Sequence, residues 1–166
     1  MGVPKRTKLQ YLLSFLFDTL VDSRSSKFNP VLDVKYYKGG YVLDAKTVNF
    51  SFGTLNRVFQ LAFDQLKIGG RPIKSVLILG YGAGSVAALL NERLNEPQIV
   101  GVEIDAEVIA IAREYFGLGE LDNVSVVEMD ATTYVQTCEE KLDLIAVDIF
   151  DDDKVPGQFY EKYFLE

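Results

Sequence analysis

Glycine and acidic residues follow the apolar segments between residues 75 and 150, each where a buried strand is expected to end. The segment Leu79–Ser85 reads LGYGAGS, a glycine-rich turn between a strand and a helix. Glycine there lets the backbone turn tightly and lets a ligand approach it closely. Glu103 lies nineteen residues beyond Gly84, where a carboxylate can accept hydrogen bonds from both hydroxyls of a ribose. The pair predicts a nucleoside-binding site formed by Gly80, Gly82, Ala83, Gly84 and Glu103.

Aspartates follow the next two apolar segments and extend this candidate site. Asp130 comes after Val124–Met129 and can accept a hydrogen bond from an adenine amino group; capping the following helix is the alternative role. Asp148 directly follows Leu142–Val147, so it is expected to open onto the same crevice. The run Asp151–Asp153 beyond it is typical of a solvated loop.

The elements that must position these residues alternate strictly between strand and helix after Pro72. Such alternation is typical of a parallel sheet with helices on both faces, whose strands end at one ligand-binding edge. We predict the α/β class, with a doubly wound, mostly parallel Rossmann-like sheet. The expected strands are Ser75–Leu79, Ile99–Ile104, Val124–Met129 and Leu142–Val147, the expected helices cover residues 84–94, 106–116 and 131–140, and the expected N-caps are Asp105 and Asp130.

A smaller unit is expected before this sheet. Apolar residues recur at helical spacing in Leu9–Val21, which predicts an amphipathic helix that covers part of the core or a dimer partner. Alternating apolar residues on both sides of the turn Lys38-Gly39-Gly40 predict a small β-hairpin, and helical spacing returns over Ser51–Lys67. We therefore divide the chain into an N-terminal unit, residues 1–50, and a nucleoside-binding domain, residues 51–166.

Composition excludes several classes of function. The 166 residues carry a net charge of −7, which works against nucleic acid, because that partner requires many phosphates to be neutralised. The chain has no histidine and a single cysteine, Cys138, which excludes disulfides, zinc clusters and Ser-His or Cys-His mechanisms. The apolar run Leu9–Val21 is too short to span a bilayer. We expect a cytoplasmic protein with no metal and with neither nucleic acid nor membrane as a partner.

Taken together, these motifs resemble the spermidine synthase superfamily over about residues 30–164, and most of all its spermidine-synthase-like methyltransferases. The resemblance rests on Val76–Gly80, on Val102–Asp105 with the following Val108-Ile109, on Asp130 and on Val147–Asp151. It implies that Glu103 holds the ribose of a nucleoside and that Asp130 contacts the adenine. It also implies that Asp148 and Asp151 face an amine substrate, with Asp148 as the base.

Two features depart from the aminopropyltransferases of that superfamily. Their glycine loop carries an aspartate that binds the ammonium group of decarboxylated S-adenosylmethionine, whereas this chain has Ala83. Loss of such a charge-assisted hydrogen bond costs about 1.5–3 kcal/mol, which favours S-adenosylmethionine as the donor. The final strands of the fold are also expected to be missing from this length of chain, which leaves a sheet edge exposed.

The leading hypothesis is therefore an S-adenosylmethionine-dependent methyltransferase that acts on a small acceptor such as an amine. Aminopropyl transfer from decarboxylated S-adenosylmethionine to a polyamine is the alternative. A catalytically silent nucleoside-binding or dimerisation module stays open, and an NAD(P) oxidoreductase is disfavoured because Ser85 replaces the third glycine of that fingerprint. A magnesium-dependent O-methyltransferase lacks the further ligands it would need.

Two further expectations concern the oligomeric state of the chain and the role of Glu103. The apolar helix and the unfinished sheet leave hydrophobic surface uncovered, which predicts a homodimer. Glu103 is expected to contribute ribose contacts and little to the core, so its replacement by alanine should abolish binding and leave the fold intact.

Overall fold

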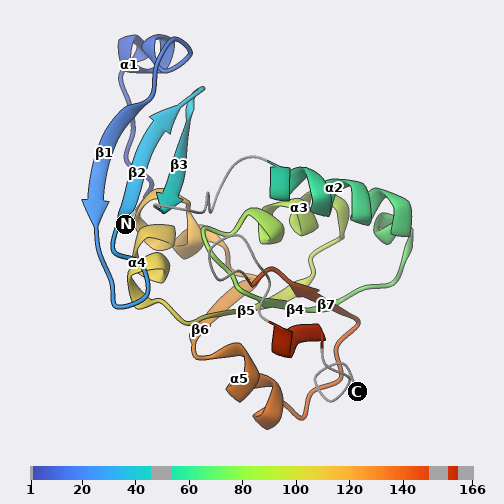
Figure 1. The fold of residues 1–166 in the computed structure, drawn as a ribbon. Coiled ribbons are helices and arrows are strands. Elements are labelled where there is room, and N and C mark those ends of the chain that lie inside the picture. Colours follow the sequence, from blue (N-terminus) through green and yellow to red (C-terminus); the bar gives the residue numbers. More distant parts are fainter. Residues whose placement is uncertain (1, 46–53, 150–156, 161–166) are drawn as a thin grey trace.

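The computed structural model describes residues 2–45, 54–149 and 157–160. They form an N-terminal antiparallel unit and a parallel α/β domain (Figure 1). The strands are β1 (Thr19–Arg24), β2 (Leu32–Tyr37), β3 (Gly40–Ala45), β4 (Ser75–Leu79), β5 (Gln98–Glu103), β6 (Val124–Glu128) and β7 (Leu144–Val147). The helices are α1 (Lys8–Leu13), α2 (Thr54–Leu66), α3 (Ser85–Arg93), α4 (Ala106–Tyr115) and α5 (Ala131–Thr137), with short 3-10 turns at Ile68–Gly70, Leu118–Glu120 and Gly157–Tyr160.

The sheet of the α/β domain has four parallel strands in the order β6-β5-β4-β7. β5 and β6 follow β4 on one side and β7 returns to the other side, so the strand order reverses between β4 and β7. Ligands of doubly wound sheets bind at this switch point, outside the carboxyl ends of the strands. Leu79 pairs with Val102 and Val147, so the residues after β4, β5 and β7 emerge at one edge. The predicted α/β class is confirmed.

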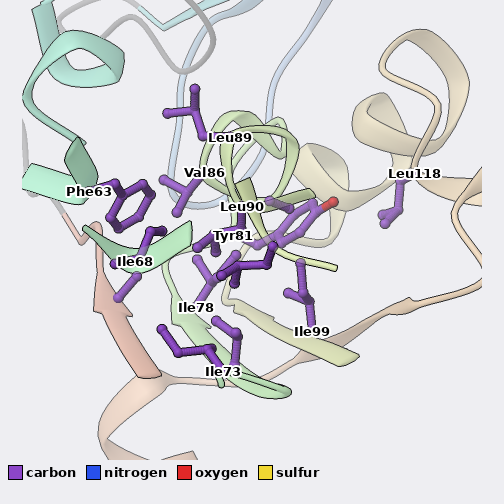
Figure 2. Packing of buried hydrophobic residues seen from close by; sticks show 14 of the residues in the cluster. Phe63, Ile68, Ile73, Ile78, Tyr81, Val86, Leu89, Leu90, Ile99 and Leu118 are labelled. Carbon is purple, nitrogen blue, oxygen red and sulfur yellow. The ribbon is translucent and has the colours of Figure 1, made fainter. Parts of the chain in front are cut away.

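Both faces of the central strand β4 are buried. Val76 and Ile78 pack into a cluster with residues of α2, α3 and α4, and Figure 2 shows the side chains around Ile78. Leu77 and Leu79 face the opposite side and pack with Ala131 of α5. Cover on both faces explains why this strand reads as a continuous apolar run.

The N-terminal unit is a three-stranded antiparallel sheet, in the order β1-β2-β3, rather than a hairpin alone. Its inward side chains alternate along β2, where Leu32 and Val34 are fully buried. They share a cluster with Val108 and Ile111 of α4, so this helix joins the unit to the α/β domain. The small β unit was predicted, and the strand β1 was missed.

The prediction of one helix over Leu9–Val21 is wrong. A capping box between Thr7 and Gln10 starts α1, which ends after six residues at Leu13, with Ser14 as its C-cap. The backbone of Ser14 accepts a hydrogen bond from Lys38 N, and the chain then pairs with β2 from Thr19 onward. Pairing with a strand distant in sequence therefore overrides local helical spacing.

The other boundaries agree with the predictions to within a few residues. β4 has its predicted bounds, and Asp105 and Asp130 are the N-caps of α4 and α5 as expected. α5 ends at Thr137, before the predicted residue 140, and the Thr137 hydroxyl donates to the carbonyls of Thr133 and Tyr134. None of the described helices is long and apolar enough to cross a membrane.

Candidate active site

The glycine turn after β4 is held by backbone hydrogen bonds. Gly80 N and Tyr81 N both donate to Val102 O of β5, at 2.9 and 3.0 Å. Gly80, Gly82 and Gly84 all have positive φ angles, of 83°, 55° and 90°. A Cβ atom at Gly80 would overlap the carbonyl oxygen of Asp148, so the turn and the end of β7 are in direct backbone contact.

Gly80→Ala should destabilise the folded chain by more than about 2 kcal/mol. A side chain in the left-handed region costs about 1–2 kcal/mol, and the overlap with Asp148 adds to that cost. Urea denaturation of the variant measures the loss. Gly119→Ala is the matched control, because no atom lies within 4 Å of a Cβ at Gly119. Equal losses in the two variants would contradict the role assigned to the turn.

Tyr81 within the turn faces the core. The residue is 4% exposed and lies among the apolar core side chains (Figure 2). Its ring lies against Gly101, where a Cβ atom would overlap it. Burial raises the pKa of Tyr81 to about 12. Glycine in the middle of an apolar strand was the sequence signal for this contact, because it often marks a close approach by another group.

Glu103, at the end of β5, is buried beneath the turn. Its Oε2 accepts a hydrogen bond from Gly82 N at 2.9 Å, and its Oε1 accepts from Ile104 N and Asp105 N at 2.9 and 3.1 Å. Burial raises the pKa of Glu103, although these three bonds act in the opposite direction. A carboxylate offers about four acceptor positions, so about one remains for a ligand hydroxyl.

Asp105 links the neighbourhood of Glu103 to the N-terminal unit. Its side chain is 2% exposed, and Oδ2 accepts hydrogen bonds from Ser26 Oγ at 2.5 Å and from Asn29 Nδ2 at 2.7 Å. Oδ1 accepts from Glu107 N and caps α4. The sequence predicted the cap, but not the two partners in the loop between β1 and β2.

Asp148, the residue after β7, carries a second carboxylate near the turn. Its backbone N donates to Leu79 O at 2.7 Å, which holds it beside the end of β4. Its Oδ1 is buried and has no hydrogen-bond partner among the described residues. Burial raises the pKa of Asp148 to about 6, and the charge of Glu103 contributes to the same shift. Carboxylates with such shifts are typical of functional sites.

Three further residues were predicted to belong to the site, namely Asp130, Ala83 and Asp151. Asp130 Oδ1 accepts from Thr133 N and so performs the capping role that was its alternative reading. Ala83 is 6% exposed and its methyl group packs with residues of the N-terminal sheet and α4, so it adds no polar group to the crevice. Asp151 lies outside the described residues.

Two apolar side chains at the strand ends were not predicted as site residues. Ile104 and Met129 directly follow β5 and β6 and are 39% and 36% exposed. Met129 N donates to the backbone carbonyl of Glu103, and Ile104 N donates to its carboxylate, so both residues adjoin Glu103. Because both side chains are exposed, they form an apolar surface beside Glu103.

Comparison with known proteins finds the spermine/spermidine synthase domain over residues 67–166. The chain is 36% identical over 94 residues to the polyamine aminopropyltransferase of Chromobacterium violaceum, and 35% identical over 98 residues to that of Thermoplasma acidophilum. These matches cover 56% and 57% of this chain but only 36% of each relative, so the chain spans about a third of their length. It is also 32% identical, over 68 residues, to an eEF1A lysine and N-terminal methyltransferase homolog of Drosophila pseudoobscura pseudoobscura, covering 41% of this chain and 10% of that relative.

Solved structures agree with the fold. A probable spermidine synthase from Corynebacterium glutamicum superposes with a TM-score of 0.75 at 19% identity, over 89% of this chain and 58% of that one. The spermidine synthase of Thermotoga maritima gives a TM-score of 0.66 at 20% identity, over 87% and 50% of the two chains. These superpositions cover more of the chain than the matched domain does, so the similarity of fold includes the N-terminal sheet. The matched domain itself contains the glycine turn, Glu103 and Asp148. The chain belongs to the spermine/spermidine synthase domain family.

Proposed function

We propose that this chain is part of a transferase that moves an aminopropyl group from decarboxylated S-adenosylmethionine to the amine of a polyamine. The observation that carries the proposal is the position of two carboxylates, Glu103 and Asp148, on either side of β4 at the carboxyl ends of the strands, near enough for their charges to interact. Ala83 was the residue in the sequence that favoured methyl transfer. The aminopropyltransferases among the relatives support the alternative better.

The residues around Glu103 fit a nucleoside. A ribose hydroxyl can donate to the open position on Glu103, and the backbone of Gly82 allows close approach. A second hydroxyl on Glu103 would have to displace one of the three backbone N–H donors. Ile104 and Met129 supply apolar surface for a flat adenine ring. Asp130 uses Oδ1 to cap α5, so a contact with an adenine amino group would use its Oδ2.

Asp148 fits the role of the base. A sulfonium donor supplies an already activated carbon, so the chain has to orient the two reactants and accept a proton from the attacking amine. A carboxyl group with a pKa of about 6 is mostly ionised at neutral pH and can still accept a proton. Activity should therefore rise as the pH increases through about 6. Asp151 is proposed as a second carboxylate that attracts the amine.

Methyl transfer from S-adenosylmethionine is the second candidate, and Ala83 is the observation that favours it. The buried methyl group of Ala83 offers no anionic partner to the ammonium of a decarboxylated donor. The methionine carboxylate of S-adenosylmethionine would instead meet backbone N–H groups at the start of α3, where anions are favoured.

Melting curves with four separate ligands should decide between these candidates. A ligand at a hundred times its dissociation constant stabilises the folded state by about 2.7 kcal/mol, or roughly 5–10 °C for a chain of this size. We expect methylthioadenosine to stabilise the chain, and decarboxylated S-adenosylmethionine to bind at least about tenfold more tightly than S-adenosylmethionine. The reverse preference would establish the methyl donor. A shift with NAD alone, or with none of the ligands, would refute the proposal.

A further inference from the structure

The helix α1 and the turn after it form an apolar projection, here called the N-terminal tip and defined as residues 8–17. No residue of α1 itself is buried. Large apolar side chains stand exposed along the tip, and Leu16 is 78% exposed. The others are Leu9, Tyr11, Leu12, Phe15 and Phe17. Monomeric proteins rarely expose so many neighbouring large apolar residues without a partner.

The tip is held in this conformation by specific contacts. Ser14, the buried residue of the tip, accepts hydrogen bonds from Lys38 N through its carbonyl and from Gly39 N through its hydroxyl. The ring of Tyr11 lies directly over Gly39, where an added Cβ would approach it to 2.6 Å, and it packs edge-on against Phe15 at 5.3 Å. The apolar side chains are therefore held outward by the β2–β3 turn.

Basic residues lie within and just before the tip in sequence, in a chain that is otherwise acidic. Lys5, Arg6 and Lys8 are the charged residues among the first 17, whereas residues 18–166 hold all 24 acidic residues and 14 basic ones. Lys38, in the turn that supports the tip, adds a further exposed cation. The nearest acidic residue in sequence, Asp18, pairs with Lys35 at 3.5 Å. Such separation of charge indicates an anionic surface as the partner.

We propose that the N-terminal tip docks onto an anionic lipid bilayer, with Leu12, Leu16 and Phe17 inserted between headgroups. Leucine and phenylalanine beside lysines are the composition of interfacial membrane segments. Each lysine or arginine near an anionic membrane surface adds further attraction. This inference reverses the expectation from sequence that no membrane is bound, because that expectation assumed the apolar run covered protein.

A second copy of the chain fits the tip less well. A two-fold contact between tips would place their lysines close to each other, and a head-to-tail contact with the acidic body would not close into a dimer. Extension of the sheet at β1 is disfavoured by the bulge between Leu20 and Asp22. α1 lies at the end of the molecule far from β4 and β7, so docking would leave the candidate active site accessible (Figure 1).

A single tryptophan provides the test, because the chain has none of its own. Leu16→Trp should show a blue-shifted fluorescence maximum with phosphatidylcholine vesicles containing about one third phosphatidylglycerol, and little shift with pure phosphatidylcholine. Leu61→Trp on α2 is the matched control, because Leu61 is also exposed but belongs to the α/β domain and not to the tip. It should show no shift with either vesicle.

Vesicle sedimentation of the full chain separates the apolar and electrostatic contributions. Leu12→Ser with Leu16→Ser, and separately Lys5→Ser with Lys8→Ser, should each weaken binding to the anionic vesicles by about tenfold or more. Val58→Ser with Leu61→Ser should leave binding unchanged. Equal binding to neutral vesicles would overturn the proposal, as would no binding at all. A dimer in light scattering that the Leu12 and Leu16 changes dissociate would assign the tip to a second copy instead.

Discussion

Asp148→Asn should remove group-transfer activity and, at about pH 8, make the folded chain more stable than the unchanged protein. An asparagine keeps the size of the side chain but cannot accept the proton of the attacking amine, and loss of a general base costs about 10²–10⁴-fold in rate. The gain in stability has a separate cause. The buried carboxylate has an unpartnered oxygen and lies near the charge of Glu103, so its ionised form is disfavoured in the folded state.

The sign of the pH dependence follows from the two pKa values. The pKa of Asp148 is 3.8 in the unfolded chain and about 6 in the folded one, so the folded state holds the proton more tightly. Stability should fall as pH rises between these values, and above about pH 6 the loss is on the order of 3 kcal/mol. The asparagine side chain of the variant carries no charge, so the variant avoids this loss. The difference between the two proteins should vanish toward pH 4.

Thermal unfolding at about pH 4.5 and pH 8 measures this effect, and Asp143→Asn is the matched control. Asp143 precedes β7, and hydrogen bonds from Lys74 N and Ser75 N lower its pKa. Its replacement should therefore lower stability at the higher pH, the opposite direction from Asp148→Asn. If Asp148→Asn and the unchanged protein have the same melting temperature at both pH values, the ionised carboxylate of Asp148 does not destabilise the folded state. If the variant retains full activity, Asp148 is not the base.

Most of the parallel domain could be predicted because its signals are local. Apolar runs of five or six residues marked β4, β5 and β6, and aspartates marked the starts of α4 and α5. The ligand-binding edge then followed from the rule for parallel sheets, since the residues after the strands meet at one side. The rule placed the glycine turn and Asp148 at the same crevice although they are far apart in sequence, and in the structure Gly80 contacts Asp148.

The failures share a physical cause, which is contact between segments distant in sequence. The periodicity of residues 9–21 carried no information about the pairing of Thr19 with Tyr36, so β1 was missed. No role was predicted for Ser26 and Asn29, because their hydrogen bonds to Asp105 depend on how the N-terminal sheet packs against α4. The burial of Ala83 depends on the same packing.

Glu103 also contributes more to the stability of the fold than its position at the end of a strand indicated. The expectation that Glu103→Ala would leave the fold intact has to be revised, because three backbone N–H groups would lose their acceptor. Each unsatisfied buried donor costs about 1–3 kcal/mol, and release of the buried charge offsets part of this. A net loss on the order of 2 kcal/mol is expected in urea denaturation, so alanine alone cannot separate binding from folding.

Glu103→Gln should weaken the binding of methylthioadenosine by about a hundredfold while the chain still folds. The glutamine amide keeps the shape of the side chain but has one acceptor oxygen in place of two. Its NH₂ group would face a backbone N–H, a second donor, so the hydrogen bond that the carboxylate accepted there is lost. No acceptor then remains for the ribose, and loss of a hydrogen bond to a charged group costs about 1.5–3 kcal/mol. Titration calorimetry measures the affinity. Glu128→Gln is the matched control, because Glu128 pairs with Glu103 across β5 and β6 but is exposed.

A methylthioadenosine analogue that lacks both ribose hydroxyls distinguishes a direct contact from a general loosening of the site. If Glu103 accepts a bond from the ribose, the unchanged protein should bind this analogue weakly, and Glu103→Gln should weaken it little further. The two changes are then strongly non-additive, as expected for groups that touch. If Glu103 acts only by holding the glycine turn through Gly82, the substitution should weaken both ligands by the same factor. That result would leave Glu103 as a structural residue and remove the main support for a nucleoside at this site.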